Sequence, residues 1–128
     1  MKQKIQSFHQ DDQKHWVANL ICGHKQHVRH DPPMVERTWV LTDEGRNSRI
    51  GQDLECRRCD EVGIAIGHAL QKEFIRILKE TFEHGGEAGM CAEGREELAI
   101  DAIQSIHLLP IIKQAIYDAN PPSQMITP

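Results

Sequence analysis

The chain has 128 residues, 27% of them charged and 5% aromatic, with four Cys, eight His and a formal net charge of −4 at pH 7. This length allows one ordinary domain or two very small ones. Its apolar runs are too short for a transmembrane helix and its first residues lack a secretory signal, so we expect a cytoplasmic protein with no membrane partner. In that compartment the cysteines are expected to be thiols or metal ligands rather than disulfides.

The composition changes near residue 62. Residues 1–62 carry ten Lys or Arg against ten Asp or Glu, together with three of the four Cys, five of the eight His and both Trp. Residues 63–128 carry five basic against nine acidic residues and are rich in the helix formers Ala, Leu and Glu. We therefore predict a β-rich domain at 1–62, a helical domain at 63–119 and a disordered tail at 120–128.

The first half is predicted to consist of short strands and turns. Residues 5–9 and 15–21 are β-like runs, and the polar residues between them suit a hairpin loop. Residues 26–30 can form a third strand, which Pro32 and Pro33 end because proline donates no ladder hydrogen bond. The turn that begins at Thr42 is expected to lead into a short helix that ends at Gly51.

The second half is predicted to contain two or three helices. Apolar residues recur at helical spacing on one face of residues 65–83, and Gly85-Gly86 is expected to end that helix. A second helix is expected to start near Cys91, whose side chain we expect to be packed. A third, short helix is predicted to start at Pro110, a residue tolerated in the first turn. Three histidines show no paired ligand spacing and are expected at the surface or at helix caps: His68, His84 and His107.

The cysteines of the first half indicate a metal site. Cys56 and Cys59 form a Cys-x-x-Cys pair, Cys22 offers a third thiolate, and zinc prefers four tetrahedral Cys or His ligands. Cys22-Gly23-His24 makes a compact knuckle, which favours His24 as the fourth ligand, with His27 and His30 as alternates. The domain at 1–62 is short of large apolar residues, so one structural zinc ion per chain is expected to stabilise it. The predicted fold class is α+β: a small zinc-stabilised β-hairpin and knuckle unit followed by a two- to three-helix unit.

Other interpretations of these cysteines remain open. Cys56 and Cys59 can also be plain buried thiols without a metal, or a redox pair, although the βαβ context of a redox motif is not visible. The surplus of histidines also allows an open metal site with a bound water. The zinc deaminase pattern does not fit, because there is no His-x-Glu and no Pro before Cys56.

Residues 22–33 read CGHKQHVRHDPP. This string resembles a family of small bacterial proteins of unknown function, and the resemblance continues through the Trp39-Val40-Leu41-Thr42 segment and the Cys56/Cys59 pair. The resemblance covers roughly residues 3 to 61 and implies a cytosolic setting but no activity. Met34 stands where the family often has Trp after the Pro pair. Segments 89–95 and 99–105 more weakly resemble a second uncharacterised bacterial family of helical proteins.

The predicted function is that of a non-enzymatic adaptor or regulator. The acidic helical half is expected to contact a protein partner or a second copy of the chain. Nucleic-acid binding through the first half is a less favoured alternative, because its basic residues are balanced by acidic ones. Its candidate residues are Arg29, Arg46, Arg49, Arg57, Arg58 and the two Trp. A metal-dependent enzyme with an open His-rich site is the third hypothesis, with His24, His27 and His30 divided between ligand and general base.

Overall fold

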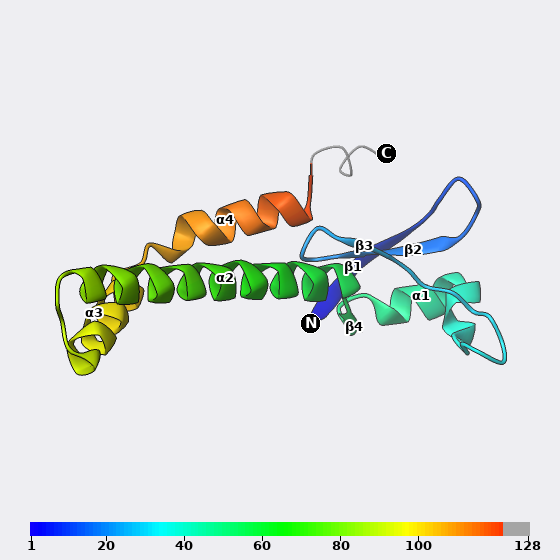
Figure 1. The fold of residues 1–128 in the computed structure, drawn as a ribbon. Helices are drawn as coiled ribbons and strands as arrows, with labels where there is room; N and C mark the ends of the chain where they lie inside the picture. Colours follow the sequence, from blue (N-terminus) through cyan, green and yellow to red (C-terminus); the bar gives the residue numbers. More distant parts are fainter. Residues whose placement is uncertain (122–128) are drawn as a thin grey trace. The chain divides into compact units, whose positions relative to one another are not determined.

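The structure, a computed structural model, describes residues 1–121 and divides into two compact units (Figure 1). The first unit is Met1–Asp60 and the second begins at Glu61. Of the tail predicted at 120–128, residues 122–128 lie outside the described residues.

The first unit contains a four-stranded antiparallel sheet in the order β3-β2-β1-β4. Its strands are β1 (Lys2–Gln10), β2 (Trp16–Leu20), β3 (Lys25–His27) and β4 (Asp53–Glu55). The two strands predicted first are confirmed as a hairpin. The predicted third strand is shorter than expected, because the chain leaves β3 after His27. Together with four α-helices, this sheet confirms the α+β class.

A small core lies on one face of this sheet. Ala18 and Leu20 of β2 are fully buried, as the period-two pattern predicts for side chains on the same face. They pack with four further buried residues: Ile5, Val28, Val40 and Cys56. Three partly buried aromatic residues pack against this cluster: Phe8, Trp16 and Trp39. The largest fully buried side chains are only Leu, Val and Cys. Apolar burial alone therefore provides limited stability for this unit.

A short 3₁₀ helix, η1 (Thr38–Leu41), and helix α1 (Asp43–Arg49) follow the hairpins. The Thr42 hydroxyl caps α1 by accepting a hydrogen bond from the Gly45 backbone N–H at 3.0 Å. The short helix predicted from this turn is thus confirmed, and Gly51 adopts the positive φ of 82° expected after it.

Three longer helices follow within the described residues: α2 (Arg57–Glu87), α3 (Ala92–Gln104) and α4 (Leu108–Ala119). The prediction that α2 starts near Ala65 and ends at Gly85-Gly86 is wrong at both ends. The helix ends instead at Glu87, and Gly89 stops it: Gly89 has a φ of +75° and its N–H bonds the Gly86 carbonyl, while Met90 N–H bonds the Gly85 carbonyl. This is a Schellman motif, and it places the left-handed residue after the glycine pair rather than at it. Within the described residues, none of the helices combines the length and apolar character needed to cross a bilayer.

Candidate metal centre

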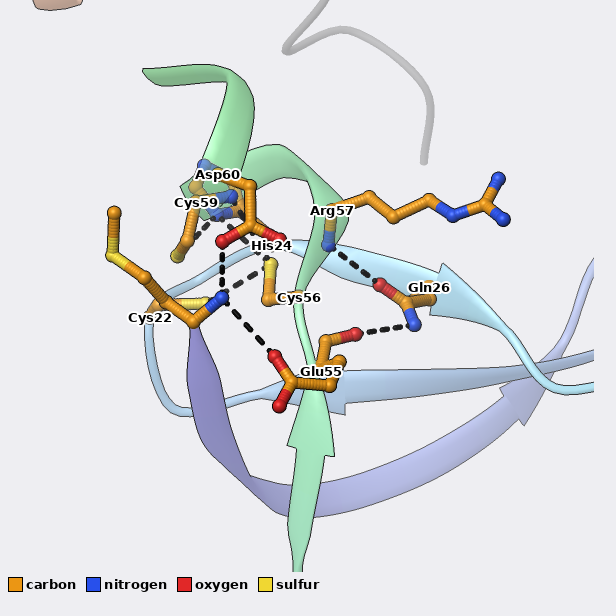
Figure 2. Close-up of polar contacts among 9 residues, drawn as sticks. Cys22, His24, Gln26, Glu55, Cys56, Arg57, Cys59 and Asp60 are labelled. Carbon is orange, nitrogen blue, oxygen red and sulfur yellow. Dashed lines mark hydrogen bonds and ion pairs between the residues drawn. The ribbon is translucent and has the colours of Figure 1, made fainter. Parts of the chain in front are cut away.

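The β2–β3 turn supplies the first half of the site. Leu20 N–H donates to the His24 carbonyl at 3.0 Å, and Gly23 N–H donates to the Leu20 carbonyl at 2.9 Å. Gly23 has a φ of +83°, which L-residues with a Cβ seldom adopt. Cys22 and His24, on either side of this turn residue in the sequence, both belong to the group of side chains drawn in Figure 2.

The junction of β4 and α2 supplies the second half. Cys56 follows β4 directly, and its N–H donates to the Met1 carbonyl at 2.9 Å. Cys59 lies in the first turn of α2, and its N–H points at the Cys56 sulfur, with N and Sγ 3.4 Å apart. Such an N–H···S contact stabilises negative charge on the sulfur. The Cys-x-x-Cys pair therefore spans the boundary between a strand and a helix.

These four side chains converge as a Cys3His cluster, composed of Cys22, His24, Cys56 and Cys59 (Figure 2). Their ligand atoms all lie within 4.8 Å of one another. The Sγ atoms of Cys22 and Cys56 are 3.8 Å apart, and His24 Nδ1 lies 3.6 Å from Cys56 Sγ and 3.4 Å from Cys59 Sγ. Around a tetrahedral zinc ion, bond lengths of about 2.3 Å to sulfur and about 2.0 Å to nitrogen imply separations of about 3.8 Å and about 3.5 Å. These three separations match those of a tetrahedral ligand shell.

Burial makes the thiolate form of Cys59 unfavourable unless a cation is present. Cys56 is buried, and Cys22, His24 and Cys59 are half-buried. Burial, followed by hydrogen bonding to the neighbouring Cys22 and Cys56 thiols, raises the pKa of the Cys59 thiol to about 12. A divalent metal reverses this preference because it binds the deprotonated form. The four residues are close enough to bind a metal ion.

Gln26 supports the cluster from β3. Its side-chain N–H donates to the Glu55 carbonyl at 2.6 Å, and its Oε1 accepts from the Arg57 backbone N–H at 3.1 Å (Figure 2). These two bonds fix the residues on either side of Cys56. Gln26 was not among the sequence-predicted site residues. The period-two spacing that places it on the same face as His24 could have indicated it.

The two alternate histidines lie elsewhere. His27 Nε2 is 2.8 Å from Asp11 Oδ2, and His30 Nδ1 accepts a hydrogen bond from the Arg37 N–H at 2.9 Å. His27 follows Gln26 in β3, so its side chain points to the opposite face of the sheet from His24. His24 is therefore the histidine that the structure brings to the three cysteines.

The predicted packing of Cys91 is wrong. Cys91 is exposed at the N-cap position of α3, and its side chain makes no capping hydrogen bond. His68, His84 and His107 are also exposed, as expected. His107 occupies the N-cap of α4 without a side-chain capping bond.

Comparison with known families concerns the first part of the chain. Residues 6–63 match the model of a family described as Protein of unknown function (DUF3565). The match confirms the resemblance to an uncharacterised family, and it contains the whole Cys3His cluster. No curated protein and no solved structure matches the chain.

Proposed function

We propose that the protein is a non-enzymatic adaptor or regulator whose N-terminal unit is stabilised by one structural zinc ion per chain. The supporting observation is the Cys3His cluster, whose sulfur and nitrogen atoms have the separations of a tetrahedral shell. Three thiolates and one imidazole are ligands that favour zinc over the hard cations magnesium and calcium. Because the apolar core of the first unit is small, the ion would add stability by linking the β2–β3 turn to the start of α2.

A structural role for the ion is favoured over a catalytic one. Catalytic zinc sites generally keep a coordination position for water or substrate, whereas structural sites use four protein ligands. Here four protein ligands are available, and neither His27 nor His30 belongs to the cluster. This supports a structural rather than a catalytic role for an ion bound by the Cys3His cluster.

The basic residues of the first unit give less support to nucleic-acid binding. Arg46 is buried, with its guanidinium over the Trp16 ring, and Arg49 lies over the Trp39 ring at 5.2 Å. These two arginines and both tryptophans thus already interact within the unit. An arginine that packs on an indole contributes less to a phosphate-binding surface than one extended into solvent.

The helical unit is the part proposed to contact protein, either a partner or a second copy. It exposes large apolar side chains on α2, α3 and α4: Ile64, Ile75, Leu78, Phe82, Ile100, Leu108, Leu109, Ile116 and Tyr117. Contiguous exposed apolar side chains are typical of interaction surfaces, and Leu78 and Phe82, one turn apart on α2, are adjacent in this way. The proposal places the protein in the cytoplasm, where reducing conditions keep thiols available as metal ligands.

Substitution of one cluster cysteine tests the zinc part. The Cys56→Ser protein, made as the full chain, is expected to bind no zinc and to unfold at a lower temperature than the wild type. Removing zinc from the wild type with a chelator is expected to lower its thermal midpoint in the same way. Cys91→Ser is the matched control, because this exposed cysteine lies outside the cluster, and it should retain both zinc and stability. If Cys56→Ser leaves metal content and stability unchanged, the proposal is wrong.

Charge substitutions on α2 test the contact surface. Leu78 and Phe82 are exposed one turn apart, so the double substitution Leu78→Glu/Phe82→Glu should abolish association detected by sedimentation or by co-purification. The control is Lys79→Glu, which changes charge on the same helix without removing an apolar group. Association that survives the double substitution, or that Lys79→Glu abolishes equally, would contradict a role for this apolar surface.

A further inference from the structure

A second group of metal-binding side chains lies at the β1–β2 loop, with no residue in common with the Cys3His cluster. This Asp–His cluster is composed of Asp11, His15 and His27, one ligand atom from each lying within 4.8 Å of the others. Asp11 Oδ2 is 2.8 Å from His27 Nε2 and 3.7 Å from His15 Nδ1. Ligands bound about 2.1 Å from one metal ion are about 3.0 Å apart at right angles and about 3.4 Å apart in a tetrahedron. The two observed separations bracket these values.

The loop holds the carboxylate in the orientation that a ligand needs. Asp11 Oδ1 accepts hydrogen bonds from the backbone N–H groups of Gln13 at 2.9 Å and His15 at 2.8 Å. The Asp11 backbone closes the same loop, because its N–H donates to the His15 carbonyl and its carbonyl accepts from Lys14 N–H. With Oδ1 engaged by the backbone, Oδ2 is left to face the two imidazoles.

The electrostatics of the loop keep Asp11 in its ligand form. Hydrogen bonding to His27, then to the backbone N–H groups of His15 and Gln13, lowers the pKa of the Asp11 carboxyl to about 2. The carboxylate is therefore ionised throughout the neutral range. A metal ion binds an imidazole through an unprotonated ring nitrogen, and one ring nitrogen of each histidine lies near the same carboxylate oxygen.

The surroundings leave room for further ligands. The cluster borders an open surface hollow of about 310 Å³, which Asp12, Gln13 and Arg29 also line. The His15 and His27 side chains are 46% and 48% exposed. A metal ion held there by three protein atoms would keep its remaining positions open to water or to a small anionic ligand, in contrast to an ion held by the Cys3His cluster.

We propose that Asp11, His15 and His27 form a second, open site for a divalent transition-metal ion that prefers imidazole and carboxylate ligands. Two histidines and one carboxylate with open positions suit Fe²⁺, Co²⁺, Ni²⁺ or Zn²⁺ and lack the sulfur that makes the first cluster selective for softer ions. The competing interpretation is that Asp11 and His27 form only an ion pair that closes the loop. The two interpretations differ in whether a second metal equivalent binds.

Nickel is a suitable probe, because its binding to nitrogen ligands can be followed by calorimetry and by paramagnetic broadening of histidine NMR signals. The full-length protein is first loaded with one equivalent of Zn²⁺ and then titrated with Ni²⁺. The expected result is one further equivalent bound, with broadening of the His15 and His27 ring signals and not of the His68 signal. No second equivalent, or broadening spread over all histidines, would overturn the proposal.

Two variants separate ligation from loop structure. Asp11→Asn removes the charged ligand but keeps an oxygen that can accept the Gln13 and His15 N–H bonds, and His15→Ala removes one imidazole. Both are expected to weaken Ni²⁺ binding by at least about tenfold while keeping the first zinc equivalent. His68→Ala, an exposed histidine on α2, is the control and should bind Ni²⁺ as the wild type does. Unchanged Ni²⁺ affinity in both variants would contradict the site, whereas loss of the zinc equivalent would bear on the Cys3His cluster instead.

Discussion

The guanidinium of Arg46 packs on the indole of Trp16, with Cζ 3.6 Å from the ring centroid. This contact joins α1 to β2, and it removes a charged group from water: Arg46 is only 7% exposed. The charge is compensated by a hydrogen bond from Nη1 to the Val40 carbonyl at 2.6 Å and by an ion pair with Asp43. Arg46 thus acts as a structural residue that links three segments of the first unit.

Replacing Arg46 is therefore expected to destabilise the first unit. Arg46→Met keeps most of the side-chain volume but removes both the cation over Trp16 and the donor to the Val40 carbonyl. We expect a loss of about 2 to 3 kcal/mol in the free energy of unfolding, measured by urea denaturation of the zinc-loaded protein. Asp43→Asn is the control: the Asp43 side chain is 85% exposed, so its ion pair should contribute less than about 1 kcal/mol. Equal losses in the two variants would contradict this account of Arg46.

Gly45 allows η1 and α1 to approach each other closely. A Cβ at this position would lie 2.3 Å from the Trp39 carbonyl oxygen and 2.8 Å from the Thr42 hydroxyl that caps α1. Because the nearest obstacle is backbone, Gly45→Ala should displace η1 or α1 and lower the thermal midpoint, at a cost of about 2 kcal/mol or more.

Gly67 provides the matched control for that substitution. It lies inside α2, and a Cβ there would meet no atom within 4 Å. Gly67→Ala should therefore stabilise the helix by up to about 1 kcal/mol through helix propensity alone. A thermal midpoint for Gly45→Ala as high as that of Gly67→Ala would show that the close approach of η1 and α1 is not required.

The carboxyl of Asp11 predicts a pH dependence of stability. Its pKa falls from an ordinary value of 3.8 to about 2 in the folded chain, chiefly through hydrogen bonding to His27. A group whose pKa is lowered by folding contributes stability above the unfolded pKa and loses it as the pH falls towards the folded pKa. The contribution of the Asp11 carboxylate to the stability difference between the wild type and Asp11→Asn should therefore be complete above about pH 5 and be lost as the pH falls from about 4 to about 2.

Urea denaturation of both proteins in metal-depleted buffer, at stepwise lower pH, measures this difference. The comparison cancels the effects of acid that the two proteins share, including protonation of the zinc ligands. A difference that stays constant down to about pH 2 would contradict the role assigned to the contacts of Asp11 with His27 and the loop backbone.

Spacing and strand periodicity were enough to predict the hairpin, the α+β class and the four members of the Cys3His cluster. The convergence of Cys22 with the Cys56/Cys59 pair rests on β4 pairing with β1, and β4 is only three residues long. Such a short strand has no periodicity that a sequence pattern can detect. The Asp–His cluster depends on a loop geometry set by Asp11 itself, so pairing His15 with His27 required the structure.

The limits of α2 illustrate why helix ends were predicted less well. Residues 57–64 contain two Arg, an Asp, a Glu and a Gly, so an apolar stripe is missing from the first turns. The helix starts there because the Cys-x-x-Cys pair turns the chain: the Asp60 N–H already bonds the Cys56 carbonyl at 3.2 Å. The Cys56/Cys59 pair, which was predicted to lie ahead of the helix, lies at the start of α2, with Cys59 in its first turn.

The central claim is that Cys22, His24, Cys56 and Cys59 bind one zinc ion. X-ray absorption at the zinc edge, on full-length protein holding one equivalent of Zn²⁺, tests it most directly. The account predicts a four-coordinate shell with three sulfur atoms at about 2.3 Å and one nitrogen at about 2.0 Å, and the loss of one sulfur in Cys59→His. A shell of nitrogen and oxygen atoms without sulfur, or a protein that retains no zinc, would contradict it.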